Sequence, residues 1–351
     1  IGTFSACSKG GGESNITGKF DWTPRELNLP PLLNSAPEGK ELKAGIIGCG
    51  GRGSGAALNF LDAGPGLTVT ALGDVFQDRI DNLKNKLKEQ KGIDIPQEKC
   101  FTGFDAFEKV IDSDVDVIIL ATPPKFRPEH FEAAVKARKH VFMEKPVAVD
   151  PTGVRQVIAA AKMADSQGLK IITGTQRRHE HSYINLLKEI NNNAIGNIVS
   201  ANVYWNGGKL WHRDNNPDWS EMEWMIRDWV NWCWLSGDHI VEQHVHNLDV
   251  ATWYMGTHPV KAIGFGSRQR RVTGDQFDNF SVDYVYEDGR QMHSMCRQIN
   301  GCANGVYEVF HGTKAIATTT GHKPQIVDAS GNQLFVAEAS ETSPYVQEHI
   351  D

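Results

Sequence analysis

Lys145, in the tripeptide Glu144-Lys145-Pro146, combines a reactive side chain with an informative position in the sequence. It directly follows an apolar run, His140 to Met143, that has the composition of a short buried strand. In open α/β sheets, ligands bind outside the carboxyl ends of the strands, which is where this lysine falls. A lysine buried beside a cofactor can lose its proton near neutral pH and do acid–base chemistry. Lys145 is therefore predicted to be catalytic.

A glycine-rich loop earlier in the chain predicts which cofactor lies beside this lysine. Gly48, Gly50 and Gly53 fit the pattern G-x-G-x-x-G between an apolar strand and a helix. The first glycine permits a tight turn, the second lets the backbone approach a pyrophosphate, and the third lets helix and strand pack closely. The phosphate then lies at the helix N-terminus. Asp74, about 20 residues further on, favours NAD over NADP because its carboxylate accepts ribose hydroxyls and repels a 2′-phosphate.

The other predicted cofactor contacts come from the loops that follow three strands. Arg52 is interpreted either as a pyrophosphate contact or as a solvated side chain, and Thr122-Pro123 either as a border of the ribose and nicotinamide or as a plain turn. The complete predicted cofactor-binding set is Gly48, Gly50, Gly51, Arg52, Gly53, Asp74, Thr122, Pro123, Glu144, Lys145 and Pro146.

The run D-H-I-V-E-Q-H-V-H-N-L-D is the densest polar stretch of the chain. If a helix begins near Glu242, then Glu242, His246 and Asp249 share one face. One interpretation makes His246 a general acid–base group oriented by a carboxylate, and a second places the histidines in a satisfied polar core. A third is a metal site that adds His239 and His244. The spacing fits neither HExxH nor HxxEH, so no metal is predicted.

Strands and helices alternate between about residues 43 and 175, which is typical of βαβ units and a parallel sheet. Beyond residue 175 the strands alternate polar and apolar residues, as in an antiparallel sheet. We therefore predict an α/β plus α+β fold. A Rossmann NAD-binding domain with a doubly wound parallel sheet spans 43–175. A C-terminal α/β domain, built on a large, open, mainly antiparallel sheet for substrate binding and oligomerisation, spans 176–351.

Residues 1–42 are predicted to form a tether and a proline-rich arm that lies on its own body or on a neighbouring subunit. The run Phe4-Ser5-Ala6-Cys7 resembles the end of a bacterial lipoprotein signal. This predicts a lipid anchor at Cys7 and a location in the cell envelope or periplasm. The alternative is a chance cysteine in a cytoplasmic protein.

Composition narrows the class of protein further. The 351 residues carry a formal net charge of −7, which argues against a nucleic-acid-binding protein. No apolar run approaches the ~20 residues needed to cross a bilayer. The six cysteines show no C-x-x-C spacing and are expected to be mostly free thiols, although Cys296 and Cys302 are close enough in sequence to bridge.

Residues 43–325 resemble the glucose–fructose oxidoreductase/inositol dehydrogenase (Gfo/Idh/MocA) family. The resemblance rests on four motifs: the loop Gly48–Gly53, Glu144-Lys145-Pro146, Gly196-Asn197-Ile198 and His246-Asn247-Leu248-Asp249. It implies that Lys145 and His246 are catalytic and that the protein forms a homodimer or homotetramer. The sequence departs from the family at Glu242, where aspartate is usual, and at Arg127, where histidine is common.

The resemblance also implies a nicotinamide-dependent oxidoreductase that moves hydride between NAD and a hydroxyl of a sugar, glycoside or cyclitol. Either Lys145 or His246 serves as the base. Two other functions stay open: an NAD-dependent glycoside hydrolase that oxidises its substrate transiently, and a non-catalytic lipoprotein that binds NAD or carbohydrate. The predicted substrate contacts are Gln176, Arg178, His179, Trp211, Asp238, His239 and Glu242.

Overall fold

The first sheet of the molecule forms from the apolar runs between residues 42 and 173. In the computed structural model, which describes residues 23–351, six parallel strands lie in the order β3-β2-β1-β4-β5-β6. The strand order reverses between β1 and β4, and ligands of doubly wound folds bind at such a point. The strands are β1 Leu42–Ile47, β2 Leu67–Asp74, β3 Cys100–Thr102, β4 Val117–Leu120, β5 His140–Met143 and β6 Ile171–Thr173.

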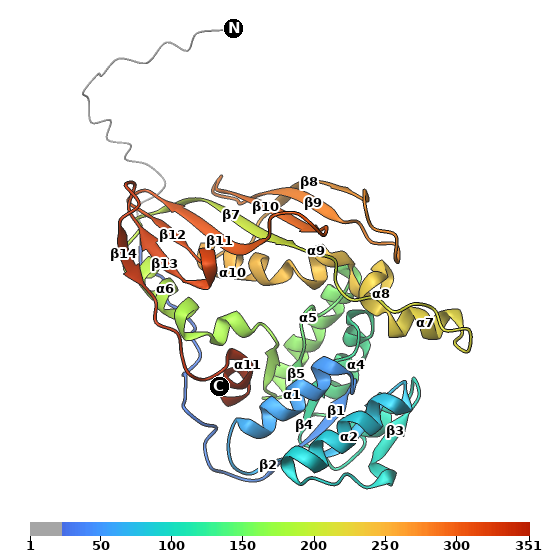
Figure 1. Ribbon diagram of the computed structural model, residues 1–351. Helices are drawn as coiled ribbons and strands as arrows, with labels where there is room; N and C mark the ends of the chain where they lie inside the picture. The colour runs from blue at the N-terminus through green and yellow to red at the C-terminus, as the bar shows by residue number, and fades with distance from the viewer. Residues whose placement is uncertain (1–22) are drawn as a thin grey trace, which may run out of the picture.

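Helices cover both faces of this sheet because successive residues of a buried strand point to opposite sides. Ile46 packs in the core formed with α1 and α2, whereas Ile47 packs in the core formed with α3, α4 and α5. Figure 1 shows this doubly wound domain in blue and green in the lower half of the molecule. The helices are α1 Gly51–Asp62, α2 Gln77–Lys91, α3 Ala106–Ile111, α4 Arg127–Lys136 and α5 Pro151–Ser166.

The second sheet has eight strands in the order β14-β13-β12-β11-β7-β10-β9-β8. Its pairs are antiparallel except β7 with β10, which run parallel. The predicted fold class is confirmed by both sheets. The strands are β7 Ile198–Gly207, β8 Lys261–Ser267, β9 Asn279–Val285, β10 Gln291–Gln298, β11 Gly305–Gly312, β12 Ile316–Thr318, β13 Gln325–Val327 and β14 Gln333–Val336.

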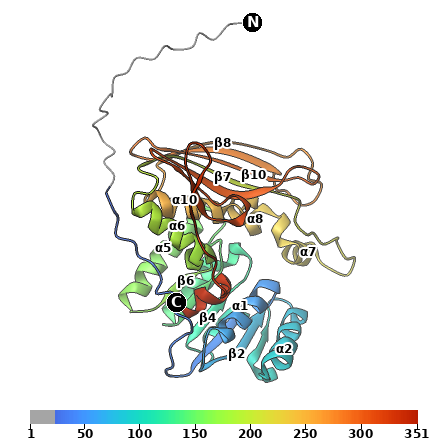
Figure 2. The same cartoon turned by 60° about the vertical axis from the view of Figure 1, so that its left-hand side comes forward.

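Helices lie on one side of the second sheet, between it and the Rossmann domain (Figures 1 and 2). Leu186 and Leu187 of α6 and Val250 and Tyr254 of α10 form the third hydrophobic core against this inner face. On the outer face, Phe265 of β8 is 78% exposed. The helices of this half are α6 His181–Asn191, α7 Glu221–Arg227, α8 Cys233–Ser236, α9 Asp238–Glu242, α10 Val245–Met255 and α11 Pro344–Ile350.

The described part of the N-terminal arm lies on the body of its own chain. The Arg25 guanidinium donates to the carbonyl oxygens of Trp253 and Tyr254, and Leu27 and Leu29 pack against the core under the second sheet. Cys7, the predicted lipid-anchor residue, lies outside the described residues. Within residues 23–351, no helix is both long and apolar enough to span a membrane.

One expectation about local structure is wrong. A continuous helix beginning near Glu242 was expected, but α9 ends at Glu242 and α10 begins at Val245. The break occurs because His244 turns inward, where its Nε2 meets Ser294 Oγ of β10 at 2.7 Å. Strands β12 to β14 were not predicted, because runs of three or four residues are too short to show periodicity. The cysteines of the described chain are free, including Cys296 and Cys302.

Candidate functional site

The glycine loop between β1 and α1 has the geometry of a phosphate cradle. Gly48 adopts φ +92°, which an L side chain rarely tolerates, and a Cβ on Gly53 would stand 1.8 Å from the Gly48 carbonyl oxygen. Around Gly50 and Gly51, by contrast, a Cβ would meet nothing within 4 Å. Helix α1 has no side-chain cap, so its first N–H groups face this open space.

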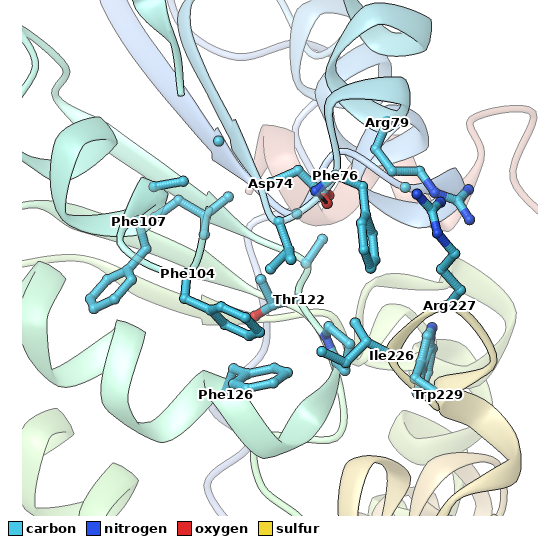
Figure 3. Close-up of a pocket in the computed structure, with 18 of the residues that line it drawn as sticks. Asp74, Phe76, Arg79, Phe104, Phe107, Thr122, Phe126, Ile226, Arg227 and Trp229 are labelled. Carbon is cyan, nitrogen blue, oxygen red and sulfur yellow. Dashed lines mark hydrogen bonds between the residues drawn. The ribbon is translucent and has the colours of Figure 1, made fainter. Parts of the chain in front are cut away.

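A cavity of about 320 Å³ opens in front of this loop at the edge of the parallel sheet. Figure 3 shows Asp74 and Thr122 on its walls with Phe76, Phe104 and Phe126 around them. The two carboxylate oxygens of Asp74 accept the backbone N–H of Cys49 at 2.7 Å and of Phe76 at 2.9 Å. Burial raises the pKa of Asp74. Its carboxylate therefore braces the loop from the wall on which an adenosine ribose would lie.

Glu144 and Arg52 connect the glycine loop to the loop that carries Lys145. The Arg52 Nε donates to Glu144 Oε1 at 2.5 Å, and its Nη2 donates to Glu348 Oε1 of α11 at 3.1 Å. A Cβ on Gly174 would lie 2.9 Å from the Glu144 carboxyl group, so only glycine leaves room there. Burial raises the pKa of Glu348 to about 9, so Glu348 is protonated at neutral pH.

Arg127, the first residue of α4, holds the two loops at the sheet edge together. It is buried and donates to three carbonyl oxygens: Thr122 at 2.8 Å, Glu144 at 2.9 Å and Pro146 at 2.6 Å. Burial lowers its pKa to about 10, which still leaves the guanidinium charged at neutral pH. Arg127 thus positions the Glu144-Lys145-Pro146 loop and does not itself need to contact a ligand.

Lys145 meets Glu242 across the boundary between the two domains. Its Nζ donates to Glu242 Oε1 at 2.9 Å and to the Glu242 carbonyl oxygen at 2.6 Å. Both side chains are largely buried, with 14% and 8% exposed. An ammonium group has three donors, so one N–H of Lys145 remains for a ligand.

His246, at the start of α10, lies close enough to Lys145 for their charges to interact. Burial, together with the positive charges of Lys145 and Arg177, holds the pKa of His246 well below its ordinary value. Its ring stacks on Trp205 of β7 with centroids 5.6 Å apart, and its nitrogens make no hydrogen bond within the described chain. A neutral imidazole with unused nitrogens can accept a proton.

Two protein-family models match the sequence of this chain. Residues 42–173 match the Gfo/Idh/MocA oxidoreductase family, NAD-binding Rossmann fold, and residues 188–343 match the C-terminal alpha/beta domain of the same oxidoreductase family. The chain belongs to the Gfo/Idh/MocA oxidoreductase family.

Among Gfo/Idh/MocA relatives, the myo-inositol 2-dehydrogenase of Thermotoga maritima is 26% identical over 226 residues, 64% of this chain. The inositol 2-dehydrogenase of Acidothermus cellulolyticus is 26% identical over 245 residues, 69% of this chain. The matched regions span only 58% and 62% of these relatives' lengths. The crystal structure of aldose-aldose oxidoreductase from Caulobacter crescentus is 19% identical, with a TM-score of 0.69 over 88% of this chain and 87% of that one. This likeness shows the shared fold.

Apart from Lys145 and Pro146, the predicted cofactor-binding residues of this Gfo/Idh/MocA protein lie in two adjoining groups. Gly48, Gly50, Gly51, Asp74, Thr122 and Pro123 line the cavity. Arg52 and Glu144 pair beside it, and Gly53 lies at the back of the loop under Gly48. The Arg52 side chain is partly exposed, and its guanidinium bonds to the carboxyl groups of both Glu144 and Glu348.

The predicted substrate contacts, by contrast, are dispersed. Arg178 pairs with Asp249, and His179 pairs with Asp351 of the C-terminal segment. The Asp249 carboxylate therefore does not share a site with His246, as the expected continuous helix required. Trp211 lines the cofactor cavity.

Three further predicted substrate contacts, Asp238, His239 and Gln176, lie apart from the Lys145–Glu242 pair in the contacts that they make. Asp238 accepts the backbone N–H of Phe277 at 2.9 Å, and the ring of His239 packs against Phe280. Gln176 retains a buried Oε1 with no hydrogen-bond partner in the described chain. In residues 23–351 no group of three or more His, Cys, Asp or Glu side chains has the arrangement to hold a metal ion.

Arg177 was not predicted, although its positive charge contributes to the lowered pKa of His246. Its Nη1 donates to the buried Glu308 at 2.6 Å, and its guanidinium lies 5.8 Å from the Trp205 ring on which His246 stacks. The run Gln176–His179 is a 3-10 turn, so its consecutive cations point in different directions. The sequence shows three basic residues in a row but not which of them turns inward.

The residues at the sheet edge fit a nicotinamide dinucleotide. The space left open at Gly50 and Gly51 suits a pyrophosphate, and Asp74 lies where a ribose hydroxyl would donate. The phenyl rings of Phe76, Phe104 and Phe126 supply apolar walls for an adenine.

Proposed function

We propose that this protein is an NAD-dependent oxidoreductase that moves hydride between NAD and a hydroxyl-bearing carbon of a sugar, glycoside or cyclitol. The observation that carries the proposal is the bond of Lys145 to Glu242 across the domain boundary, with His246 near enough for the charge of Lys145 to lower its pKa. The substrate class is supported by the inositol 2-dehydrogenases and by the aldose-aldose oxidoreductase, which share the family and the fold respectively.

The bound cofactor would supply a nicotinamide ring that accepts or returns a hydride. In the oxidation direction, an unprotonated ring nitrogen of His246 takes the proton of the substrate hydroxyl. The free N–H of Lys145 donates to the same oxygen and stabilises negative charge as the C–O bond becomes a carbonyl. Glu242 keeps the ammonium in place. His246 is thus proposed as the base and Lys145 as the fixed cation.

We propose NAD as the preferred cofactor, because Asp74 presents a carboxylate on the wall of the cavity. The proposal predicts tighter binding of NAD than of NADP in a direct titration. Equal or tighter binding of NADP would contradict it. An Asp74→Ser variant is expected to lose most of this preference, because serine can donate to a 2′-phosphate and does not repel it.

The activity is tested by following NADH formation with a panel of sugars, glycosides and cyclitols. Lys145→Met and His246→Gln are expected to lose turnover and still bind NAD, since neither side chain lines the cavity at the glycine loop. Lys170→Met and His258→Gln, at exposed positions, serve as matched controls with unchanged turnover. A wild-type protein that binds no NAD would refute the proposal.

We also propose that the outer face of the second sheet joins copies of this chain into a homodimer or homotetramer. In support, Ile263 and Phe265 of β8 are 66% and 78% exposed, and no helix of the described chain covers that face. Burying such side chains stabilises an interface by roughly 1.5–3 kcal/mol each. Light scattering is expected to show an oligomer that Phe265→Asp weakens, and a monomeric wild type would contradict the idea.

A further inference from the structure

A segment of the C-terminal domain closes over the cofactor cavity of the Rossmann domain. This flap, residues 208–232, leaves the sheet after β7 and contains α7, which Figure 1 shows in yellow beside the lower domain. Ile226 and Trp229 of the flap line the same cavity as Gly50 and Asp74. In Figure 3, Ile226 and Trp229 lie across the cavity from Asp74. The cavity wall is therefore completed by residues from both domains.

One arginine fastens the flap to the Rossmann domain. Arg227 donates from Nη2 to Asp78 Oδ1 at 2.9 Å and from Nη1 to Asp78 Oδ2 at 3.2 Å. Its guanidinium also lies 3.8 Å from the centre of the Phe76 ring and 4.9 Å from that of Trp219. Asp78 is in the first turn of α2, directly after the loop that carries Phe76. The pairing is bidentate and stacked, a geometry that lysine cannot reproduce.

The flap is internally braced between its extended part and its helix, and its last residues are bonded to the C-terminal domain through Val230 and Asn231. Ser220 caps α7 by accepting the N–H of Glu223 at 3.1 Å. The indole N–H of Trp224 donates to the Arg213 carbonyl oxygen at 2.8 Å, and the Asp228 carboxylate accepts the Arg213 N–H at 2.7 Å. The extended part of the flap is thereby tied to its helix.

The fastening has a direct consequence for a dinucleotide whose adenosine half occupies the cavity. Gly50 and Asp74 lie on one side of that half, and Ile226 and Trp229 lie on the other. The adenosine cannot leave past the flap while Arg227 holds Asp78. Release of the cofactor past the flap then requires breaking a charge-assisted bidentate pair and a stacked contact.

We propose that the flap is a lid that retains the dinucleotide from one turnover to the next, with Arg227 as the residue that fastens it. The inference rests on the proposed function, because it takes the cavity to be the NAD site. It deepens that function by assigning a step: cofactor exchange is controlled at the Arg227–Asp78 pair. Arg227 acts through the position of the flap and is not a catalytic residue.

The test is the dissociation rate of NADH, measured by mixing the preloaded protein with excess NAD and following the fluorescence of bound NADH. Arg227→Met and Asp78→Asn are each expected to release NADH at least about tenfold faster than the wild type, equivalent to about 1.4 kcal/mol. Arg155→Met, which changes an exposed arginine of α5, is the matched control and should leave the rate unchanged.

Reversing the charges of the Arg227–Asp78 pair distinguishes the loss of this ion pair from a general disturbance of the structure. The double variant Asp78→Arg with Arg227→Asp restores an ion pair in reverse and is expected to release NADH more slowly than either Asp78→Arg or Arg227→Asp alone. Single variants that release NADH at the wild-type rate would overturn the lid, and so would a double variant as fast as its two parents. A wild type that binds no NADH would instead overturn the proposed function, and the lid with it.

Discussion

The Glu242 carboxylate determines the orientation of Lys145. Together with the backbone carbonyl oxygen of Glu242, it accepts hydrogen bonds from the ammonium group of the opposite domain, so Lys145 is fixed before any substrate enters. His246, which the resemblance pairs with an acidic residue four positions earlier, is oriented here by stacking on Trp205 instead. The family's usual aspartate is thus replaced by a longer residue that bonds to the lysine and not to the histidine.

Glu242→Gln is expected to reduce kcat/KM at least about tenfold while NAD binding is retained. The amide keeps the shape of the side chain, but it removes the negative charge that compensates a largely buried ammonium. Breaking such a pair costs about 3–5 kcal/mol, so thermal unfolding should also shift to lower temperature. Glu89→Gln, on the exposed face of α2, is the control. Unchanged steady-state kinetics in Glu242→Gln would show that Lys145 needs no carboxylate partner.

At this scale the sequence predicts the residues of short local motifs and misses those that depend on the fold. Lys145 and the glycine loop were identified because adjacent residues specify their positions relative to a strand end. Arg177 was missed because its inward direction depends on Glu308, a partner far away in the sequence. The bonding of Glu242 to Lys145 was missed because it joins two domains.

At the scale of elements, α4 serves the site through its first residue. The single guanidinium of Arg127 bonds both to the loop after β4 and to the loop after β5, and so joins the two loops. Two of its three carbonyl partners, Glu144 and Pro146, flank Lys145 in the sequence, so these bonds fix the backbone on both sides of Lys145. The strands and helices that surround it were predictable from alternating apolar patterns, but the spacing between neighbouring loops was not.

Arg127→Met is expected to destabilise the protein by about 3 kcal/mol or more, because it leaves buried carbonyl oxygens without donors at about 1–3 kcal/mol each. Catalysis should fall as well, since the Lys145 loop loses its anchor. Chemical denaturation and steady-state kinetics measure the two effects. Arg155→Met, which loses only an exposed contact to Thr152, should change neither. A stable, fully active Arg127→Met protein would contradict this positioning role.

At the scale of the whole molecule, buried histidines make the fold sensitive to acid. Burial lowers the pKa of each of five of them below the unfolded value of about 6.5. The lowered values are about 4 for His130 and about 3 for His239, His244 and His349, with His246 shifted in the same direction. Below pH 6.5 the unfolded chain therefore binds protons that the folded chain does not.

The melting temperature is expected to fall steadily between pH 6.5 and pH 5, because each such histidine contributes up to about 1.4 kcal/mol per pH unit. Glu348, whose pKa is raised to about 9, acts in the opposite direction. Burial also raises the pKa of the carboxyl groups of Asp74, Asp228, Asp238 and Glu308, so the predicted fall is the net effect of the five histidines against these acids. His349→Phe should reduce the slope, since the ring lies against Phe142 and its Nε2 has no partner in the described chain. A melting temperature independent of pH over this range would contradict the prediction.

The bond between Arg52 and Glu348 joins residues that are 296 positions apart. At a translation rate of about 5–20 residues per second, some 15–60 s separate the synthesis of the glycine loop from that of its partner on α11. The Rossmann domain can therefore fold on the ribosome well before α11 exists, with Arg52 lacking its second carboxyl partner in that interval. Cofactor captured by the nascent chain would meet a loop braced by Asp74 and Glu144 but not yet by Glu348.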